Sequence, residues 1–417
     1  MTEPTLDDPT RSASAEEAAA PSRQRGLMAL LALANVSMFA LYLGVGGVLI
    51  PTQIAQLDPA HKVATLGLVG GIGAVFATVF NPIAGALSDR SGRRGPWIVG
   101  GALASLGVMA LLGSVDTVLL VAIGWCLGQA TMNVYQAATT AIVPDRIAPA
   151  RRGAASAMVG LGLPVGGTLG VMIASATVGT PRTGYLALGA IVAVAAALLT
   201  VLGREPRRTA LPAVPLREQI ATFLSALANH DFRWAFIGRA LLVLGWFSVF
   251  SYQLYILADH TELPAGLTPP AAMAILTPVS MAAMAVSTVI GGVLSDRWNR
   301  RKLFVGAAAA LSGVVMIVPV VSPTWDGMLV FSALNGLAFG CFMAVDTALV
   351  TLVLPKSADA ARDMGVINIA SAGPQIVAPF VASAVIANLG GYPGLFLVGG
   401  ALSVLGALAI VPIRSVR

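Results

Sequence analysis

Charge is scarce in this sequence, and so are the residues that build metal centres and disulfides. Asp, Glu, Lys and Arg make up 11% of the 417 residues, whereas soluble domains use about 25%. The two cysteines, Cys126 and Cys341, are too few for a disulfide or zinc framework. The three histidines stand at the edges of apolar runs, and the sequence shows no phosphate loop, nucleophile elbow or zinc-ligand spacing. An enzyme, a metal site and a cofactor are therefore not expected.

Long apolar runs take the place of charge. Hydrophobic residues make up 57% of the chain, and the mean hydropathy is +0.83. A helix of about 20 apolar residues spans the hydrocarbon of a bilayer. The sequence predicts twelve such helices, at residues 27–50, 64–87, 97–112, 118–143, 155–178, 185–202, 234–258, 271–294, 303–321, 328–354, 365–389 and 395–412. The predicted fold class is therefore an all-α membrane protein with twelve transmembrane helices.

The basic residues gather on one side of these predicted helices. With the N-terminus in the cytosol, every Lys and Arg except Lys62, Arg182 and Arg239 falls in a cytosolic segment. This is the positive-inside pattern, so the net charge of +6 indicates topology rather than a nucleic-acid partner. We expect a monomer that passes many times through the inner (plasma) membrane, surrounded by the lipid bilayer, with both termini cytosolic.

Three segments are not apolar. Residues 1–25 have no apolar period, which predicts a disordered cytosolic tail. Residues 204–233 separate two groups of six helices, at 26–203 and 234–413, and contain helically spaced apolar residues. That spacing predicts an amphipathic helix on the cytosolic membrane surface. Residues 414–417 form a short cytosolic tail.

A ten-residue motif occurs once in each group, between its second and third helices. It reads GALSDRSGRR from Gly85 to Arg94 and GVLSDRWNRR from Gly292 to Arg301, 207 residues later. We name these segments the first and second hinge motifs. Their recurrence indicates an internal duplication, as found in transporters that work by alternating access. Two pseudo-symmetric six-helix bundles are therefore predicted.

The helix count and the doubled motif together resemble the major facilitator superfamily over nearly the whole chain. The first hinge motif fits that family's signature at Gly85, Leu87, Asp89, Arg90, Gly92, Arg93 and Arg94. The second motif repeats Gly292, Asp296, Arg297, Arg300 and Arg301, with Asn299 where the first has Gly92. Asn tolerates a left-handed turn, so this change is mild. The resemblance implies a secondary transporter whose halves rock about a cavity lined by the first, fourth, seventh and tenth helices.

The resemblance gives the hinge residues physical roles. Gly85 and Gly292 would let helices approach closely. Asp89 is expected to meet the N-terminal end of the eleventh helix, and Asp296 that of the fifth helix. The arginines of both motifs are expected to contact carboxylates and lipid phosphates. Together these contacts would close the cytosolic side. The alternative is that the hinge charges only fix the topology.

Asp346 is an acid well inside a predicted span, the tenth. A carboxylate in the membrane is costly unless it is paired, protonated or facing water, so it indicates a functional site. Arg239, about five residues into the seventh helix, is its natural partner. Burial next to a cation suits a proton-coupling switch. Two alternatives stay open, namely a permanent structural ion pair and an Arg239 that reaches for the membrane surface.

Helical periodicity predicts one face on each cavity helix, because residues 4, 7 and 11 apart nearly superimpose about the axis. These faces combine amides with aromatic rings. The predicted substrate-contacting residues are Asn35, Phe39 and Tyr42; Gln129, Asn133, Gln136 and Thr140; Trp246, Phe250 and Gln253; and Asn335 and Phe342. Amides face protein or water, and aromatic faces suit sugars or planar drugs. For any one residue, contact between helices is the alternative.

The substrate and the direction of transport stay open. The stretch NVYQAA and the sequence Arg94-Gly95-Pro96-Trp97 are faintly similar to the sucrose and glycoside cation symporters. Drug antiporters of the family usually carry an arginine in the fourth helix and a Gly-Pro pair in the fifth, and this chain has neither. We expect proton-coupled uptake of a small sugar-like or polar solute. The alternatives are proton-coupled efflux of a small amphiphile or drug, and a non-transporting receptor or lipid scramblase.

Overall fold

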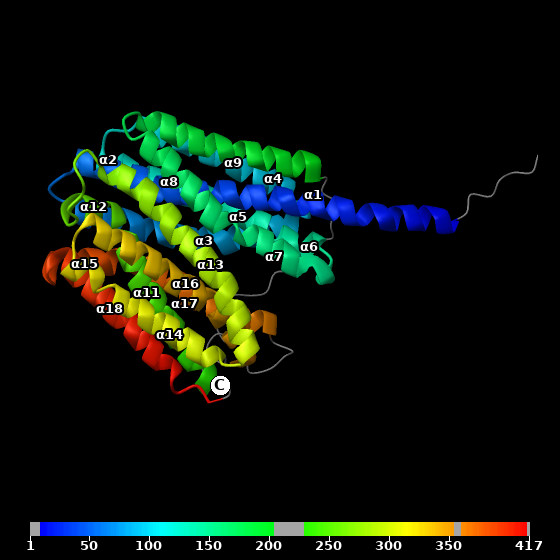
Figure 1. The fold of residues 1–417 in the computed structure, drawn as a ribbon. Helices are drawn as coiled ribbons and strands as arrows, with labels where there is room; N and C mark the ends of the chain where they lie inside the picture. The colour runs from blue at the N-terminus through cyan, green and yellow to red at the C-terminus, as the bar shows by residue number, and fades with distance from the viewer. Residues whose placement is uncertain (1–8, 204–228, 354–359, 415–417) are drawn as a thin grey trace, which may run out of the picture.

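The structure, a computed structural model, describes residues 9–203, 229–353 and 360–414. These residues form long helices that lie side by side in two groups (Figure 1). The first half contains α1 (Pro9–Gly44), η1 (Val45–Leu49), α2 (Ile50–Leu57), α3 (Lys62–Ser91), α4 (Gly95–Leu112), α5 (Val118–Thr140), α6 (Ile142–Arg146), η2 (Pro149–Arg151), α7 (Arg152–Gly160), η3 (Gly162–Gly166), α8 (Gly167–Ala176) and α9 (Pro181–Gly203). The second half contains α11 (His230–Phe250), α12 (Gln253–Asp259), α13 (Pro269–Trp298), α14 (Arg301–Val315), α15 (Val318–Val321), α16 (Trp325–Val353), α17 (Ala360–Asn388) and α18 (Gly391–Ile410).

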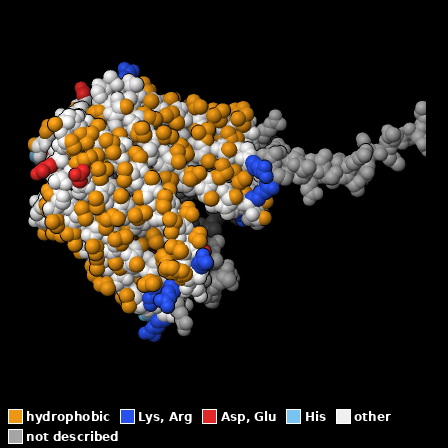
Figure 2. Space-filling model, viewed as in Figure 1, with side chains coloured by type: hydrophobic (Ala, Val, Ile, Leu, Met, Phe, Trp, Pro, Cys, Tyr) orange, Lys and Arg blue, Asp and Glu red, His pale blue; other side chains and the backbone are white. Residues whose placement is uncertain are grey.

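The described residues contain twelve spans long and apolar enough to cross a membrane, as predicted. Hydrophobic side chains cover the outer surface of the spans (Figure 2). The first span joins α1, η1 and α2, and the fifth joins α7, η3 and α8. Their π-helical segments, η1 and η3, precede Pro51 and contain Pro164. Proline lacks the N–H that an α-helix needs, so the backbone widens locally instead of breaking.

Two predicted segments differ in the structure. Residues 9–25 begin α1, whereas the sequence predicts disorder there. The run from Ala15 to Ala20 consists of Ala and Glu, which have high helix propensity. The predicted seventh helix is broken into α11 and α12 at Tyr252, whose backbone leaves the helical region at φ −111°, ψ 10°. The predicted amphipathic helix between the halves and the tail residues 415–417 lie outside the described residues.

Single residues with a suited backbone conformation or side chain end the helices of the hinge motifs and begin α11. Gly92 ends α3 with φ 64°, and Asn299 ends α13 with φ 50°. Both residues adopt the left-handed conformation that closes a helix, which Gly and Asn favour. Asn229 caps α11 by accepting from the backbone N–H groups of Asp231 and Phe232. The hinge motifs therefore have the same backbone course in both halves, although one uses Asn and the other Gly.

The halves touch at one end of the molecule. We name the end that carries the two hinge motifs the hinge face, and the opposite end the Asp259 face. Helix α3 packs on α17, and α13 packs on α8. A Cβ on Gly67 would lie 2.6 Å from the Cβ of Ser383, and one on Gly70 would lie 3.3 Å from Pro379. At the hinge face, Figure 2 shows a hollow between the halves. The molecule is therefore closed at the Asp259 face and open at the hinge face.

Within the first half, α1 and α8 are in backbone contact. A Cβ on Gly170 would lie 2.0 Å from the carbonyl oxygen of Ala40, whereas one on Gly107 of α4 would meet nothing within 4 Å. We expect Gly170→Val to lower the free energy of unfolding by about 1–3 kcal/mol or more, because the backbone of α1 must move away. Thermal unfolding of the purified protein in detergent measures this. Gly107→Val, which has the same change in helix propensity, serves as the control. Equal melting temperatures for the two variants would contradict the packing described.

Candidate functional site

Arg239 of α11 and Asp346 of α16 form an ion pair inside the second half. Arg239 Nη1 donates to Asp346 Oδ2 over 2.9 Å, and its Nε donates to Ser371 Oγ of α17 over 2.8 Å. The two charged side chains expose only 8% and 3% of their surface. The partnership predicted from the sequence is therefore present. Removal of either partner would leave a buried charge without its counter-ion, which is strongly unfavourable. A proton on Asp346 would have the same electrical effect on Arg239.

Two turns along α11 from Arg239, Trp246 lies at the centre of an aromatic cluster. Its ring stacks on Phe250 with centroids 4.7 Å apart and on Phe339 of α16 with centroids 4.2 Å apart. Phe247 meets it edge-on at 4.8 Å. The indole Nε1 of Trp246 is buried and has no hydrogen-bond partner among the described residues. Buried indole N–H groups normally have one, so this donor is unusual.

The first half offers amides and a phenol instead of charges. Asn81 of α3 donates to Asn133 Oδ1 over 3.1 Å, and Asn133 Nδ2 donates to the Tyr42 hydroxyl over 3.2 Å. That hydroxyl donates in turn to Gln136 Oε1 over 3.1 Å. The chain of hydrogen bonds joins α1, α3 and α5, and each bond polarises the next. The structure thus brings together Tyr42, Asn133 and Gln136, three of the predicted substrate-contacting residues.

Three predicted cavity residues lie elsewhere. Asn35 donates to Leu31 of its own helix and packs against Gly162 of η3. Asn335 accepts from Ser312 of α14 over 2.9 Å, so it joins α16 to α14. Phe342 is fully buried in the core of the second half. These side chains share helical periodicity with cavity residues, but they serve helix packing because neighbouring helices cover their faces.

The other predicted residues are half-buried or exposed. Phe39 lies edge-on to Tyr42 with ring centroids 6.5 Å apart, and the Gln129 backbone carbonyl accepts from Asn133. Thr140 is exposed and bonds to its own helix. Gln253 begins α12, beyond the break at Tyr252, so it does not continue the face of α11 that carries Arg239 and Trp246.

Four residues of these networks were not predicted. Phe339 lies seven residues before Asp346, so the period that selected the other positions could have found it. Asn81 lies in α3, which the sequence analysis does not count among the cavity helices. Ser371 of α17 and Asp145 of α6, which pairs with Arg94 of the first hinge motif, carry no distinguishing sequence signal.

Each hinge motif contains its own ion pair. Arg94 pairs with Asp89 of its own motif and with Asp145, which follows α5, at 3.3 Å. Arg301 pairs with Asp296, with Nη2 to Oδ1 at 2.7 Å. Arg94 is buried and Arg301 is only half-buried, so the first motif is the more firmly held. The remaining hinge arginines, Arg90, Arg93, Arg297 and Arg300, are exposed.

The ion pairs of the hinge acids lie within each motif. A Cβ on Gly85 or Gly292 would meet nothing within 4 Å, so neither glycine permits a close approach here. Asp89 bonds to Arg94, and Asp296 bonds to Arg301. The side chains at the N-terminal end of α17 lie outside the described ones, so the expected contact of Asp89 with that end stays a prediction.

At the Asp259 face, side chains join the halves directly. Lys62 Nζ lies 2.7 Å from Asp259 Oδ1, and Tyr392 donates to Asp259 Oδ2 over 2.7 Å. Tyr252 donates to the Val63 carbonyl, and Tyr255 donates to the Pro51 carbonyl. The contacts of Lys62, Tyr252 and Tyr255 join the second half to the first and hold this face closed, whereas the Tyr392 bond lies within the second half.

A second acid of the Asp259 face is held ionised. Asp58 interacts with the His61 ring at 3.0 Å and accepts from the backbone N–H of His61 and from Thr65. The hydrogen bond with the His61 ring, more than the others, holds the pKa of the Asp58 carboxyl below its usual value.

Within the described parts of the chain, no three His, Cys, Asp or Glu side chains gather to hold a metal ion.

Comparisons with known proteins agree with this architecture. The protein MFS transporter asaE of Aspergillus flavus is 24% identical over 359 residues, which cover 82% of this chain and 77% of that protein. A bacterial homologue of the human lysosomal transporter Spinster superposes with a TM-score of 0.70 at 16% identity, covering 94% of this chain and 95% of the other. A peptide transporter POT in complex with sulfate gives 0.73 at 14% identity, covering 93% and 94%. A mutant of the nucleoside transporter NupG gives 0.73 at 14% identity, covering 93% and 99%.

The sequence model of the Major Facilitator Superfamily matches residues 27–280 and 263–416, and thus nearly the whole chain. With its twelve spans, two halves and repeated hinge motif, the chain belongs to this superfamily of secondary transporters, which are not enzymes.

Proposed function

We propose that the protein takes up a small polar, sugar-like solute together with protons, with Arg239 and Asp346 as the coupling pair. The buried ion pair carries this proposal. A proton on Asp346 removes the attraction that holds Arg239, and Arg239 also bonds to Ser371 of α17. Helix α17 is in turn the helix that packs on α3 at the closed face. Protonation of one carboxyl therefore acts on the helix that joins the halves.

The chemistry around the pair supports a solute with hydroxyl groups and an apolar face. The amides of Asn133 and Gln136 and the Tyr42 hydroxyl can exchange hydrogen bonds with hydroxyls. The stacked rings of Trp246 and Phe339 supply the flat apolar surface that sugar faces bind. The same rings favour a second candidate, proton-coupled efflux of a small amphiphile. Such a molecule would be bound more by the aromatic rings than by the amides.

The orientation is part of the proposal. Lys and Arg side chains gather mostly at the hinge face in Figure 2, and the visible acids lie at the opposite end. By the positive-inside rule the hinge face is cytosolic, as are both termini, and the membrane is the plasma membrane. The conformation described here is then inward-facing. A monomer suffices, because the cavity lies between the halves of one chain.

Asp346→Asn tests the coupling pair. We expect pH-driven accumulation in proteoliposomes to fall at least about tenfold, because the neutral amide cannot exchange a proton, while counterflow exchange stays within about threefold. Asp116→Asn, which neutralises an exposed loop acid, is the control. The substrate is first found by thermal-shift screening of sugars against hydrophobic cations. Accumulation that persists in Asp346→Asn would exclude this residue as the coupling site.

Asp259→Asn tests the closure of the Asp259 face. The amide keeps the Tyr392 hydrogen bond but loses the ion pair with Lys62, so we expect the open form of this face to rise about two- to fivefold relative to the closed form. Spin labels at the exposed positions Ala60 and Ala265, with both native cysteines replaced, report the distance across the face. An unchanged distance distribution would show that the ion pair does not hold the halves.

Asp89→Asn should act in the opposite direction. If Asp89 meets the N-terminal end of α17 when the hinge face closes, its neutralisation weakens that closed form, and the inward-facing population should rise by a similar factor. The same labels at Ala60 and Ala265 should then report a larger fraction of short distances. Asp116→Asn again provides the comparison. A shift toward long distances would refute the proposed role of Asp89.

A further inference from the structure

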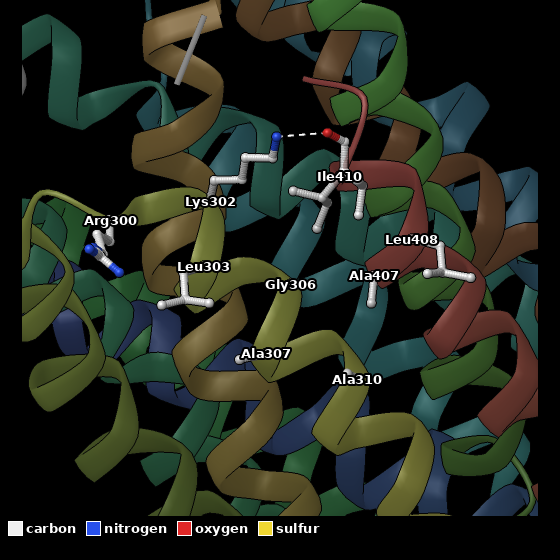
Figure 3. Close-up of a pocket in the computed structure, with 10 residues that line it drawn as sticks. Arg300, Lys302, Leu303, Gly306, Ala307, Ala310, Ala407, Leu408 and Ile410 are labelled. Atoms are coloured by element: carbon white, nitrogen blue, oxygen red, sulfur yellow. Dashed lines mark hydrogen bonds between the residues drawn. The ribbon is translucent and has the colours of Figure 1, made fainter. Parts of the chain in front are cut away.

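A groove with a volume of about 630 Å³ lies on the outer surface of the second half, between α14 and α18 and next to the hinge face (Figure 3). Its floor is made of small residues, Gly306 and Ala310 of α14 and Ala407 of α18. A Cβ on Gly306 would meet nothing within 4 Å, so the space above this residue is open. Leu303 and Leu408 beside it expose 55% and 58% of their surface, as side chains that face lipid do. The groove therefore opens toward the hydrocarbon of the membrane.

Two cations stand at the end of the groove. Lys302 reaches across to the end of α18, where its Nζ donates to the carbonyls of Val411 over 2.7 Å and Ile413 over 2.6 Å (Figure 3). These bonds fix the ammonium and leave one of its three N–H groups for another acceptor. The Arg300 guanidinium has no partner in the part of the chain that the structure describes. No acid lines the groove. Among the described residues that line the groove, the charge at this end is therefore positive.

The residues that form the groove in the second half are replaced by others at the matching positions of the first half. Counting back by the 207-residue repeat, Gly95 stands at the position of Lys302, Val99 at that of Gly306 and Leu103 at that of Ala310. Helices α4 and α9 nevertheless pack as α14 and α18 do. The fold alone thus does not require the groove, which arises from three residues in which the halves differ.

We propose that this groove binds an anionic phospholipid, with its phosphate at Lys302, the rest of its headgroup toward Arg300 on the other side of the start of α14, and one acyl chain along Gly306 and Ala310. An α-helix rises 1.5 Å per residue, so Lys302 and Ala310 lie about 12 Å apart along α14. The cations then stand at the depth of the headgroups while the small residues line the hydrocarbon. A fixed ammonium and a free guanidinium prefer a phosphate without a compensating cation to a zwitterionic headgroup. The proposal does not depend on the transported substrate.

Native mass spectrometry of the full-length protein in detergent tests the proposal with phosphatidylglycerol and phosphatidylcholine of identical acyl chains. We expect one phosphatidylglycerol to bind about tenfold more tightly than phosphatidylcholine, as a site with two cations predicts. Arg300→Gln should remove about fivefold of this preference, and Lys302→Gln should remove at least as much. Gly306→Leu fills the open space above the floor, so it should weaken both lipids.

Arg297→Gln is the matched control, because it neutralises an exposed arginine of the same hinge motif that does not line the groove. It should leave the preference within about twofold. Arg300→Gln keeps the Lys302 bonds to α18, so it tests the site even if Lys302→Gln impairs folding. Equal binding of the two lipids, or equal effects of Arg297→Gln and Arg300→Gln, would overturn the proposal. So would full competition by glycerol phosphate, which has the headgroup charge without the chains.

Discussion

The cost of placing charge in hydrocarbon is the constraint on which the rest of this structure depends. Because of this cost, most acids and bases lie at the two faces. There Lys62 pairs with Asp259, and each hinge motif contains its own ion pair. Arg239 and Asp346 depart from this arrangement and are tolerated because they satisfy one another. A pair that must be matched inside the membrane is sensitive to a single proton. The same constraint that orders the fold is thus the reason why we propose this pair as the coupling site.

The two halves share the hinge motif but differ in their charged residues inside the membrane. Both hinge motifs share the Asp–Arg pair and the left-handed residue that ends the preceding helix, Gly92 or Asn299. Counting back by the repeat from Arg239 and Asp346 leads to Ala32 and Thr139, which carry no charge. The lipid-facing groove described above lies in the second half. The two halves thus share a frame and carry different side chains on it.

The sequence predicted features that depend on a single residue or on the average hydropathy of a long segment. It did not predict features that depend on which residues of neighbouring helices pack together. Twelve spans follow from run length, and the partner of Asp346 follows because a charge in the membrane needs a counter-charge. Periodicity gives a face of a helix but not what covers it, so the bond from Ser312 of α14 to Asn335 was not predicted. Gly85 was expected in a close contact, and no atom lies within 4 Å of a Cβ placed on it in this structure.

Helix α3 shows how closure of one face excludes closure of the other. It is about 45 Å long, with Gly67 and Gly70 against α17 at the Asp259 face and Gly85 unopposed near the hinge face. When the halves tilt about the closed end, the other end of such a helix moves away from its partner. Asp89 keeps Arg94 as its counter-ion while the hinge face is open, so opening leaves no hinge carboxylate without a cation. The free energies of the two conformations can therefore be close, as alternating access requires.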